Sequence, residues 1–355
     1  MKNIHTTIFI IAVVFFSMTV NAQFDNVGTS AGTFLKIGVG GRGTALGGAF
    51  TATVDDPSAL YWNVAGLSHL SRNEIMFAHN DWIADLNHSF VAAGIPIEDF
   101  GTVGVSVSYL SMGEMKVTTW EETEGTGGTF TAYDLAIGLA YARKLTDQFS
   151  LGLQAKYVSE VISESQAGAL AVDAGIQYNT GIRGIRLGAS ISNFGMSMRL
   201  QGRDTRLTID PYPIAGSNPN DVVANTETQE WPLPMTFQFG VAMDAIKDDV
   251  NALTINFDYR DERDFRPVPY MSAEYNFRGV LFLRGGTNLY VLQERYNDLD
   301  DKYKEVSQLN VSGINAGVGI HWDFPEVNML VKVDYSYSDL HILQSAHRIS
   351  VGFAF

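Results

Sequence analysis

The sequence predicts an all-β protein, a transmembrane antiparallel β-barrel of about fourteen strands with an N-terminal segment that plugs its lumen. Three observations carry this prediction: period-two alternation from residue 71 onward, connections that are short and long in turn, and an apolar run near the start of the chain. The 355 residues include 34 glycines, 21 phenylalanines and 15 tyrosines, but no cysteine. Glycine and aromatic residues in alternating segments are typical of closed β-structures, and the lack of cysteine excludes a disulfide-stabilised secreted domain.

Strands are indicated wherever apolar side chains alternate with small or polar ones. In the stretch VGVSVSYL, Val103, Val105 and Val107 point to one face, whereas Gly104 and Ser106 point to the other. A soluble β-sandwich alternates in the same way, so the pattern alone does not decide between the two. The predicted strands lie near 71–79, 87–96, 102–111, 130–142, 148–160, 168–178, 184–194, 234–245, 250–260, 268–277, 279–289, 310–320, 327–337 and 346–355.

The predicted connections favour a membrane barrel over a sandwich. Connections after the even-numbered strands are short, whereas those after the odd-numbered strands are longer, and three are very long, at about 112–129, 195–233 and 290–309. Short turns at one end, long loops at the other and strands of about ten residues are typical of outer-membrane barrels. Since an open edge in lipid leaves backbone groups unpaired at a cost of several kcal/mol each, we expect the strands to close.

The first 22 residues have the features of an export signal. Lys2 precedes an apolar run from Ile8 to Val20, and Val20 and Ala22 occupy the small-residue positions of a signal-peptidase site. The run is shorter than the roughly 20 apolar residues that a membrane-spanning helix needs. The predicted organisation is a signal peptide at 1–22, a plug segment at 23–70 and a barrel at 71–355.

The end of the sequence, HRISVGFAF, reads as a closing strand. Ile349, Val351, Phe353 and Phe355 share one face of this strand. A last strand that ends on an aromatic residue resembles the signal that the barrel assembly machinery reads, so Phe353 and Phe355 are the predicted assembly signal. Together with the export signal, this predicts a bacterial outer-membrane protein with membrane lipid as a partner.

Charge and motif spacing exclude several classes of function. The net charge of −15 at pH 7 argues against nucleic acid, because phosphate binding needs a basic face. Gly38, Gly40 and Gly43 match the G-x-G-x-x-G spacing of a dinucleotide loop, but no βαβ unit follows them. The stretch GTSAG, Gly28–Gly32, matches G-x-S-x-G without the strand–turn–helix context that a nucleophile elbow needs.

Metal and catalytic sites are not indicated either. The histidines are scattered without a metal-binding spacing such as H-E-x-x-H, and the acidic run 297–305 lacks the glycine of an EF-hand loop. We therefore predict no catalytic residue, no metal and no cofactor. One enzymatic alternative stays open, a barrel-embedded hydrolase with a Ser–His pair near the outer rim that uses His79 or His341.

Residues 23–70 lack clean alternation over a barrel strand's length, and their composition favours packing inside the barrel. Small residues allow backbone to approach the wall closely, at Gly40, Gly41, Gly43, Ala45, Gly47, Gly48 and Ala49. Asp55–Ser58 precedes ALYWN and predicts the cap of a short helix. Large apolar residues such as Phe50, Leu60 and Trp62 favour a packed plug over a flexible tail.

The stretch GRGTALGGAFTATVDDPSALYWNVAGL resembles the N-terminal motif of the PorV/PorQ family, within the wider FadL-like group of outer-membrane barrels. The departure is Val64, where the family carries proline. The residues that match the family are Arg42, Gly47, Gly48, Ala49, Asp55, Asp56, Ala59, Tyr61, Trp62, Asn63, Ala65, Gly66 and Leu67. The predicted plug and gate motif consists of Arg42, Gly47, Gly48, Asp55, Asp56, Pro57, Tyr61, Trp62, Asn63, Val64, Ala65 and Gly66.

The resemblance implies two non-enzymatic functions. The first is a role in type IX secretion, in which the protein receives exported cargo from the translocon and holds it at the cell surface, with the loops at 195–233 and 290–309 as docking surfaces. The second is FadL-like transport of fatty acids or hydrocarbons, in which the plug moves and a gap in the wall near Asn63–Ala65 releases a hydrophobic ligand. A water-filled porin is disfavoured, because an N-terminal segment of this length would obstruct the lumen.

Overall fold

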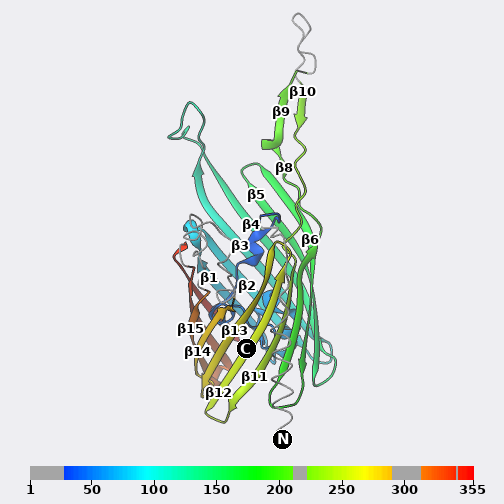
Figure 1. Cartoon of the computed structure of the whole chain (residues 1–355), viewed down its shortest axis with the longest axis vertical. Coiled ribbons are helices and arrows are strands. Elements are labelled where there is room, and N and C mark those ends of the chain that lie inside the picture. The colour runs from blue at the N-terminus through cyan, green and yellow to red at the C-terminus, as the bar shows by residue number, and fades with distance from the viewer. Residues whose placement is uncertain (1–27, 211–221, 290–312, 341–342) are drawn as a thin grey trace, which may run out of the picture.

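The computed structural model describes residues 28–210, 222–289, 313–340 and 343–355, so the predicted signal peptide lies outside the described residues. Fourteen antiparallel strands form a closed barrel (Figure 1), in which β1 (Glu74–Asp81) pairs with β17 (Ser345–Ala354) to complete the ring. The other wall strands are β2 (Asn87–Ile97), β3 (Gly101–Lys116), β4 (Thr129–Lys144), β5 (Phe149–Ile162), β6 (Ser165–Asn179), β7 (Arg186–Gly195), β11 (Thr236–Lys247), β12 (Asn251–Glu262), β13 (Phe265–Phe277), β14 (Leu281–Asn288), β15 (Asn315–Phe324) and β16 (Met329–Asp339). The closed, fourteen-stranded antiparallel barrel predicted from the sequence is therefore confirmed.

Short helices and strands precede the wall strands or lie in the connections between them. The wall apart, the described elements are η1 (Thr33–Lys36), α2 (Gly41–Ala45), α3 (Ala59–Trp62), η2 (Val64–His69), η3 (Ile83–Asp85), β8 (Gln201–Gly202), η4 (Arg203–Thr205), β9 (Arg206–Ile209), β10 (Val222–Asn225) and η6 (Pro325–Val327). Strands β9 and β10 pair as a hairpin that stands at the far end of the molecule from the short turns (Figure 1). No helix in the described ranges is long and apolar enough to cross a membrane.

The wall is apolar outside and small or polar inside. In β3, the outward Val105 is 50% exposed, whereas the inward Ser106 next to it is 7% exposed. Outward apolar side chains of the same kind occur on the other strands, at Phe77, Val91, Leu139, Leu153, Leu170, Phe239, Phe257, Met271, Leu283, Ile320, Val333 and Ile349. An exposed apolar belt on a wall whose backbone groups are paired is suited to lipid, and it places the protein in the bacterial outer membrane.

The two ends of the barrel differ in their connections, with one departure from the predicted layout. The short turns, which include 98–100 and 278–280, gather at one end, here named the turn end; the opposite end is named the loop end. Two of the expected longer connections are wrong, because β5 joins β6 through Ser163–Glu164 alone and β12 joins β13 through 263–264. The strands continue past the apolar belt, and their ladder still pairs Ile162 with Ser165. Strands β3–β6 accordingly rise above the others in Figure 1.

The N-terminal segment, residues 33–70, lies in the lumen. Its helix α2 contacts β14–β17, whereas η2 contacts β3–β6 on the other side of the ring. Leu46, Phe50 and Leu67 are at most 1% exposed. The segment therefore touches both sides of the closed wall and buries its apolar side chains between them.

Lumen-facing glycines of the wall let this segment approach closely. A Cβ added at Gly286 of β14 would lie 2.3 Å from the carbonyl carbon and oxygen of Leu46. A Cβ added at Gly152 of β5 would lie 2.4 Å from the carbonyl carbon of Val64. Both neighbours are backbone atoms that cannot rotate away, so these two positions exclude any side chain.

Gly286→Ala tests this close packing, and Gly285→Ala is its matched control on the outer face of the same strand. A Cβ at Gly285 has no neighbour closer than the carbonyl oxygen of Asn315, at 3.8 Å. We expect Gly286→Ala to lower the stability of the folded barrel by about 1–3 kcal/mol through overpacking, and Gly285→Ala to change it by less than about 0.5 kcal/mol. Thermal unfolding in detergent measures both, and equal midpoints for the two variants would contradict the packing described here.

Candidate functional site

The centre of the lumen is built around Trp62. Its indole is 3% exposed, and Nε1 donates a hydrogen bond to the carbonyl oxygen of Val39 at 3.1 Å. A Cβ at Gly43 would lie 2.4 Å from Nε1, and one at Gly38 would lie 3.2 Å from the ring. Two of the three glycines that match a dinucleotide loop, Gly38 and Gly43, therefore make room for an indole ring. No phosphate cradle between a strand and a helix is formed there.

The neighbouring motif residues have distinct structural roles. Gly47 and Gly48 have φ angles of +63° and +88°, which other residues rarely adopt. Tyr61 packs edge-on against Trp62, with ring centroids 4.8 Å apart. The N-cap residue of α3 is Ser58, whose side chain makes no cap hydrogen bond, so the predicted side-chain cap is not formed there. Asp56 Oδ1 accepts from the backbone N–H of Ser58 at 2.8 Å, in the turn before the helix.

Arg42 connects the motif to the wall. Its Nη1 contacts Asp55 at 2.5 Å and Asp56 at 3.4 Å, and its Nε donates to Glu274 of β13 at 2.9 Å. The guanidinium also lies 4.9 Å above the ring of Phe50. One cation thus joins the two sequence-adjacent aspartates of the N-terminal segment to a wall carboxylate, and the structure brings Arg42, Asp55 and Asp56 together as one unit.

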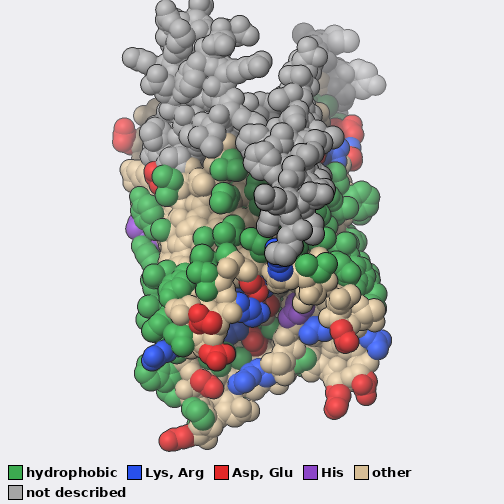
Figure 2. Space-filling view, turned by 60° about the horizontal axis from the view of Figure 1, so that its bottom comes forward, with side chains coloured by type: hydrophobic (Ala, Val, Ile, Leu, Met, Phe, Trp, Pro, Cys, Tyr) green, Lys and Arg blue, Asp and Glu red, His purple; other side chains and the backbone are tan. Residues whose placement is uncertain are grey.

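The ion-pair network continues along the wall toward the turn end. Arg284 of β14 donates to Glu274 at 2.6 Å and to Asp334 of β16 at 2.5 Å. Nearby, Lys332 donates to Glu74 at 2.8 Å beside a small cavity of about 20 Å³. Figure 2, viewed toward the turn end, shows charged side chains gathered in the hollowed middle of this face, with hydrophobic side chains on its flanks.

Asn63 fixes the turn between α3 and η2. Its Oδ1 accepts from the N–H of Ala65 at 3.2 Å, and its Nδ2 donates to the carbonyl oxygens of Thr51 at 2.8 Å and Ile176 at 3.0 Å. The wall beside it is paired, because Gly175 of β6 stands opposite Ser190 of β7. Val64, Ala65 and Gly66 are buried in η2 against β4–β6.

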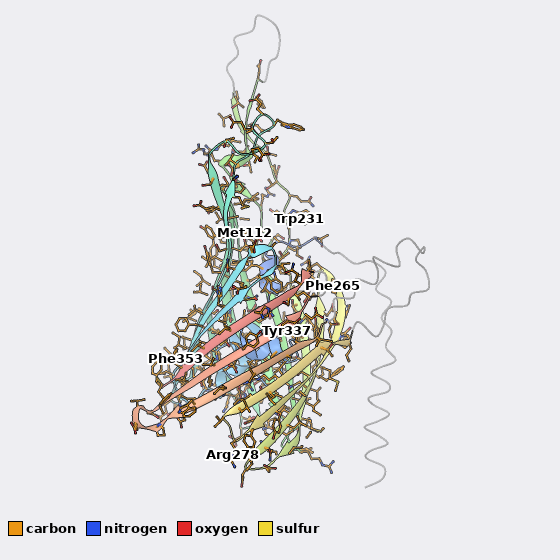
Figure 3. All side chains as sticks on the ribbon, turned by 90° about the vertical axis from the view of Figure 1, so that its left-hand side faces the viewer. Met112, Trp231, Phe265, Arg278, Tyr337 and Phe353 are labelled. Atoms are coloured by element: carbon orange, nitrogen blue, oxygen red, sulfur yellow. The ribbon has the colours of Figure 1, made fainter. Side chains whose placement is uncertain are left out.

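The loop-end half of the lumen is apolar. Phe34, Leu35 and Ile37 of the N-terminal segment pack there against inward side chains of four neighbouring strands and against two loop residues. The wall and loop members of this chamber are Leu110, Ala136, Val158, Ala167, Ala169, Ala171, Met198 and Leu233. We name it the loop-end chamber. Met112 and Trp231 lie in the same half in Figure 3, far from Arg278 at the turn end.

A cavity of about 50 Å³ lies between this chamber and Trp62. Leu35, Tyr61, Phe90 and Ala136 line it together with the polar Lys156 and Gln238. Since one water needs roughly 10–15 Å³ by this kind of measure, the space holds a few waters and no larger molecule while the N-terminal segment stays in place.

Two buried polar side chains of the lumen wall lack partners within the described ranges. Asn80 is 3% exposed, and neither its Nδ2 nor its Oδ1 has a hydrogen-bond partner. Asp134 is 7% exposed and takes part in no hydrogen bond or ion pair. Unpaired polar groups inside an otherwise packed lumen are candidates for contact with a ligand.

The hydrolase alternative is not supported by the outer rim. His79 Nδ1 lies 3.0 Å from the hydroxyl of Ser89, and its Nε2 lies 3.3 Å from Asp81. Both partners are on the outer surface, where the paired backbone of β1 and β2 offers no free N–H groups for an oxyanion. His341 lies outside the described residues. Within those residues, no group of three His, Cys, Asp or Glu side chains could hold a metal ion.

The assembly signal stays a prediction. Phe353 of β17 stands opposite Val331 and Ile75, and it lies low on the outer wall in Figure 3. Phe355 is 56% exposed, and its N–H donates to the carbonyl oxygen of Asn73 at 2.9 Å. Nothing in this geometry identifies a receptor for either ring.

Comparison with known proteins gives a match to a family model over part of the chain and a shared fold. Residues 10–133, which include the N-terminal segment and β1–β3, match an uncharacterised protein family, UPF0164. No curated protein matches the chain significantly.

Several solved structures share the architecture. The toluene transporter TbuX of Ralstonia pickettii is 11% identical, with a TM-score of 0.52 over 89% of this chain and 97% of that one. The monoaromatic hydrocarbon channel CymD is 12% identical, with a TM-score of 0.52 over 90% and 98%. The toluene transporter TodX of Pseudomonas putida is 11% identical, with a TM-score of 0.51 over 88% and 96%. The chain shares the fold of outer-membrane hydrocarbon transporters.

This likeness concerns the fold, and it bears on the two implied functions unequally. It agrees with the FadL-like resemblance in architecture, and by name these neighbours are transporters or channels. It gives no support to the narrower PorV/PorQ resemblance or to type IX secretion.

Sequence reasoning found one half of the ion-pair network. It selected Arg42, Asp55 and Asp56, but not their wall partners Glu274 and Arg284. A charged residue at an inward position of a predicted strand was the available signal, and it does not reveal which residue far along the chain stands opposite.

Arg42→Met tests whether the network holds the N-terminal segment, with Arg203→Met as a control. The substitution leaves Glu274 and Asp56 without Arg42 in a buried site, so we expect the docking of residues 38–67 to weaken by about 3–5 kcal/mol. Arg203 pairs with Glu164 at the surface, with side chains 72% and 50% exposed, so its loss should cost less than about 1 kcal/mol.

Hydrogen exchange of residues 38–67 in detergent measures how far Arg42→Met weakens the docking of this segment. A double variant, Arg42→Met with Glu274→Gln, should recover part of the protection, because it also removes one of the carboxylates that have lost Arg42 and leaves Arg284 with Asp334 as its partner. Unchanged exchange in Arg42→Met would show that the segment is held by packing alone.

Proposed function

We propose that the protein is an outer-membrane channel for hydrophobic small molecules, with the N-terminal segment as its plug. The observation that carries this proposal is the loop-end chamber. A water-filled pore has a polar lumen, whereas here the β3–β6 side of the loop-end half is lined mostly by Leu110, Val158 and small alanines. An apolar surface that faces the lumen is suited to an apolar occupant, and Phe34 and Leu35 occupy it in this structure.

The arrangement supports a plug with a fixed part and a displaceable part. The part at 41–67 is held by ion pairs through Arg42 and by close backbone packing at Gly152 and Gly286. The part at 28–35 is held mainly by apolar contacts and by single hydrogen bonds such as that from Gly32 N–H to Glu160 at 2.7 Å. Lys36, whose ammonium lies 3.0 Å from the buried Asp264 and 3.5 Å from Glu262, marks the start of the held part. A hydrophobic ligand that enters from the loop end would replace the apolar contacts of this second part.

A route from the chamber to lipid is supported by the pairing of β6 and β7. Their register shifts between Val172 and Ala174, and β7 ends at Gly195, opposite Ala171. Beyond that point, the short strand β8 pairs with β6 only at 165–166. The interrupted ladder borders the chamber at Ala167 and Ala169. We therefore place the proposed gate there, rather than beside Asn63, where the ladder is intact.

Filling the chamber tests the proposal. Ala169 of β6 faces the chamber and is 4% exposed, whereas its neighbour Leu170 faces outward and is 60% exposed. We expect Ala169→Trp to reduce uptake of labelled toluene by cells toward the level of cells that lack the protein, because the indole occupies the route. Leu170→Trp is the matched control and should transport normally.

Equal amounts of folded barrel in the outer membrane, measured by heat-modifiable gel mobility, are required for this comparison. Normal uptake by Ala169→Trp would exclude the chamber as the route. Uptake that does not depend on the protein at all would reject the proposed function.

The secretion role is a second candidate, favoured by one observation. Strands β3–β6 and the hairpin β9–β10 project beyond the rest of the barrel (Figure 1), and Trp120 between β3 and β4 is 100% exposed. A projecting surface with an exposed indole is suited to a protein partner. Affinity capture of the full chain from outer membranes, with and without Trp120→Ala, tests this role. Recovery of translocon or cargo proteins that depends on Trp120 is expected if it holds, and their absence argues against it.

A further inference from the structure

The loop-end chamber contains a pair of carboxylates that face each other across two strands. Asp134 of β4 stands directly opposite Glu160 of β5, and both lie at inward positions. Their neighbours in the ladder belong to the chamber, since Leu110 stands opposite Asp134 and Ala167 stands opposite Glu160. The two acids are therefore set into an apolar wall.

These carboxylates lack a cation within the described part of the chain. Asp134, 7% exposed, has no hydrogen-bond or ion-pair partner, and Glu160 accepts one hydrogen bond, from the N–H of Gly32. The lysine nearest along β5, Lys156, is already engaged, because it lies 2.8 Å from Asp173 and 2.5 Å from the amide oxygen of Asn193.

The burial of Asp134 without a donor and the position of Glu160 directly opposite it both make the pair of carboxylates unfavourable without a ligand. A largely buried carboxylate with no donor pays much of the cost of desolvation when it is ionised, and two ionised carboxylates directly opposite each other on a sheet are destabilising. A positively charged donor would relieve both costs at once. Apolar walls around a few unsatisfied polar groups are the usual composition of a small-molecule site.

We propose that Asp134 and Glu160 bind the ammonium group of an organic amine whose apolar body lies in the loop-end chamber. This inference rests on the proposed function and specifies its substrate class: a hydrophobic molecule with a cationic head. The ammonium takes the place of the Gly32 N–H at Glu160 when the segment at 28–35 leaves, and it supplies Asp134 with a donor. The net charge of −15 also favours cations over organic anions near the protein.

Arg348, a buried cation of the same lumen, does not neutralise the pair. It stands opposite Asn80 on β1, so β1, β2 and β3 separate it from Asp134 along the ring. Its Nη1 donates to Ser338 at 2.8 Å, and its guanidinium lies 5.2 Å from the ring of Trp82. Arg348 therefore interacts with Ser338 and Trp82. Among the described residues, Asp134 has no hydrogen-bond or ion-pair partner.

Binding of three ligands with one ring and different heads tests the inference. The full chain, purified in detergent, is titrated by calorimetry with benzylamine, toluene and benzoate at neutral pH, where benzylamine is an ammonium ion. The variants are Asp134→Asn and Glu160→Gln, and the matched control is Asp261→Asn, which removes an exposed, outward carboxylate near the loop end of β12. Asp134→Asn removes an unpaired buried charge, so it should not lower the thermal unfolding midpoint.

We expect wild type to bind benzylamine about tenfold more tightly than toluene, since a charge-assisted hydrogen bond contributes about that factor. Benzoate should bind no more tightly than toluene. Asp134→Asn should abolish the preference for benzylamine and leave toluene binding unchanged, Glu160→Gln should reduce it, and Asp261→Asn should behave as wild type.

The outcomes separate this inference from the proposed function. Toluene binding without a preference for benzylamine, or a preference that Asp134→Asn leaves intact, overturns the inference and leaves the channel standing. A preference for benzoate also overturns it and assigns the head-group site to Arg348. Binding of none of the three ligands rejects the inference together with the hydrophobic channel.

Discussion

A closed wall of fourteen strands encloses more space than its own inward side chains can fill, and the rest of the structure depends on how this space is occupied. In the turn-end half, the N-terminal segment meets the wall through charges, with Arg42 between Asp56 and Glu274. In the loop-end half, it meets the wall through Phe34 and Leu35, and through the ion pair of Lys36 with the buried Asp264. The stretch before Lys36 is therefore attached by apolar contacts, whereas Lys36 and the residues around Arg42 are attached by charges.

This difference has a mechanical consequence. A buried ion pair resists the removal of one partner, because the charge left behind is costly, whereas apolar contacts can be exchanged for those of another apolar molecule at little net cost. The stretch at 41–67 is thus suited to remain in place. The stretch at 28–35, which ends before the ion pair of Lys36 with Asp264, can give way to a ligand without loss of the barrel, whose strand pairing does not include it. A channel that stays closed to water but admits hydrophobic molecules needs both properties.

The wall could be predicted from the sequence because alternation is local. Val105 and Ser106 reveal opposite faces by themselves, and a run of such pairs fixes each strand and its direction. The ends of β5 and β6 could not be predicted in this way, since the ladder between Ile162 and Ser165 continues where the apolar pattern has stopped. The wall partner of Arg42 also could not be predicted from the sequence, because Glu274 comes close to Arg42 only when the whole ring of strands has closed.

The N-terminal motif shows why a spacing of glycines is weak evidence of chemistry, and why the departure at Val64 is tolerated. Gly38 and Gly43 are required because a larger side chain at either position would clash with the indole of Trp62. This requirement is steric, and the G-x-G-x-x-G spacing alone does not separate it from a requirement for phosphate binding.

A proline at position 64 would need an extended residue before it and suits the first position of a helix. Asn63 has a φ of −165° and a ψ of 107°, and Val64 begins η2. The backbone a proline would favour is thus already present, and the side chain of Asn63 holds it by bonding Ala65 and Thr51. Residue 64 therefore does not decide whether this turn is rigid, and any movement of the segment has to occur on the loop-end side of Trp62.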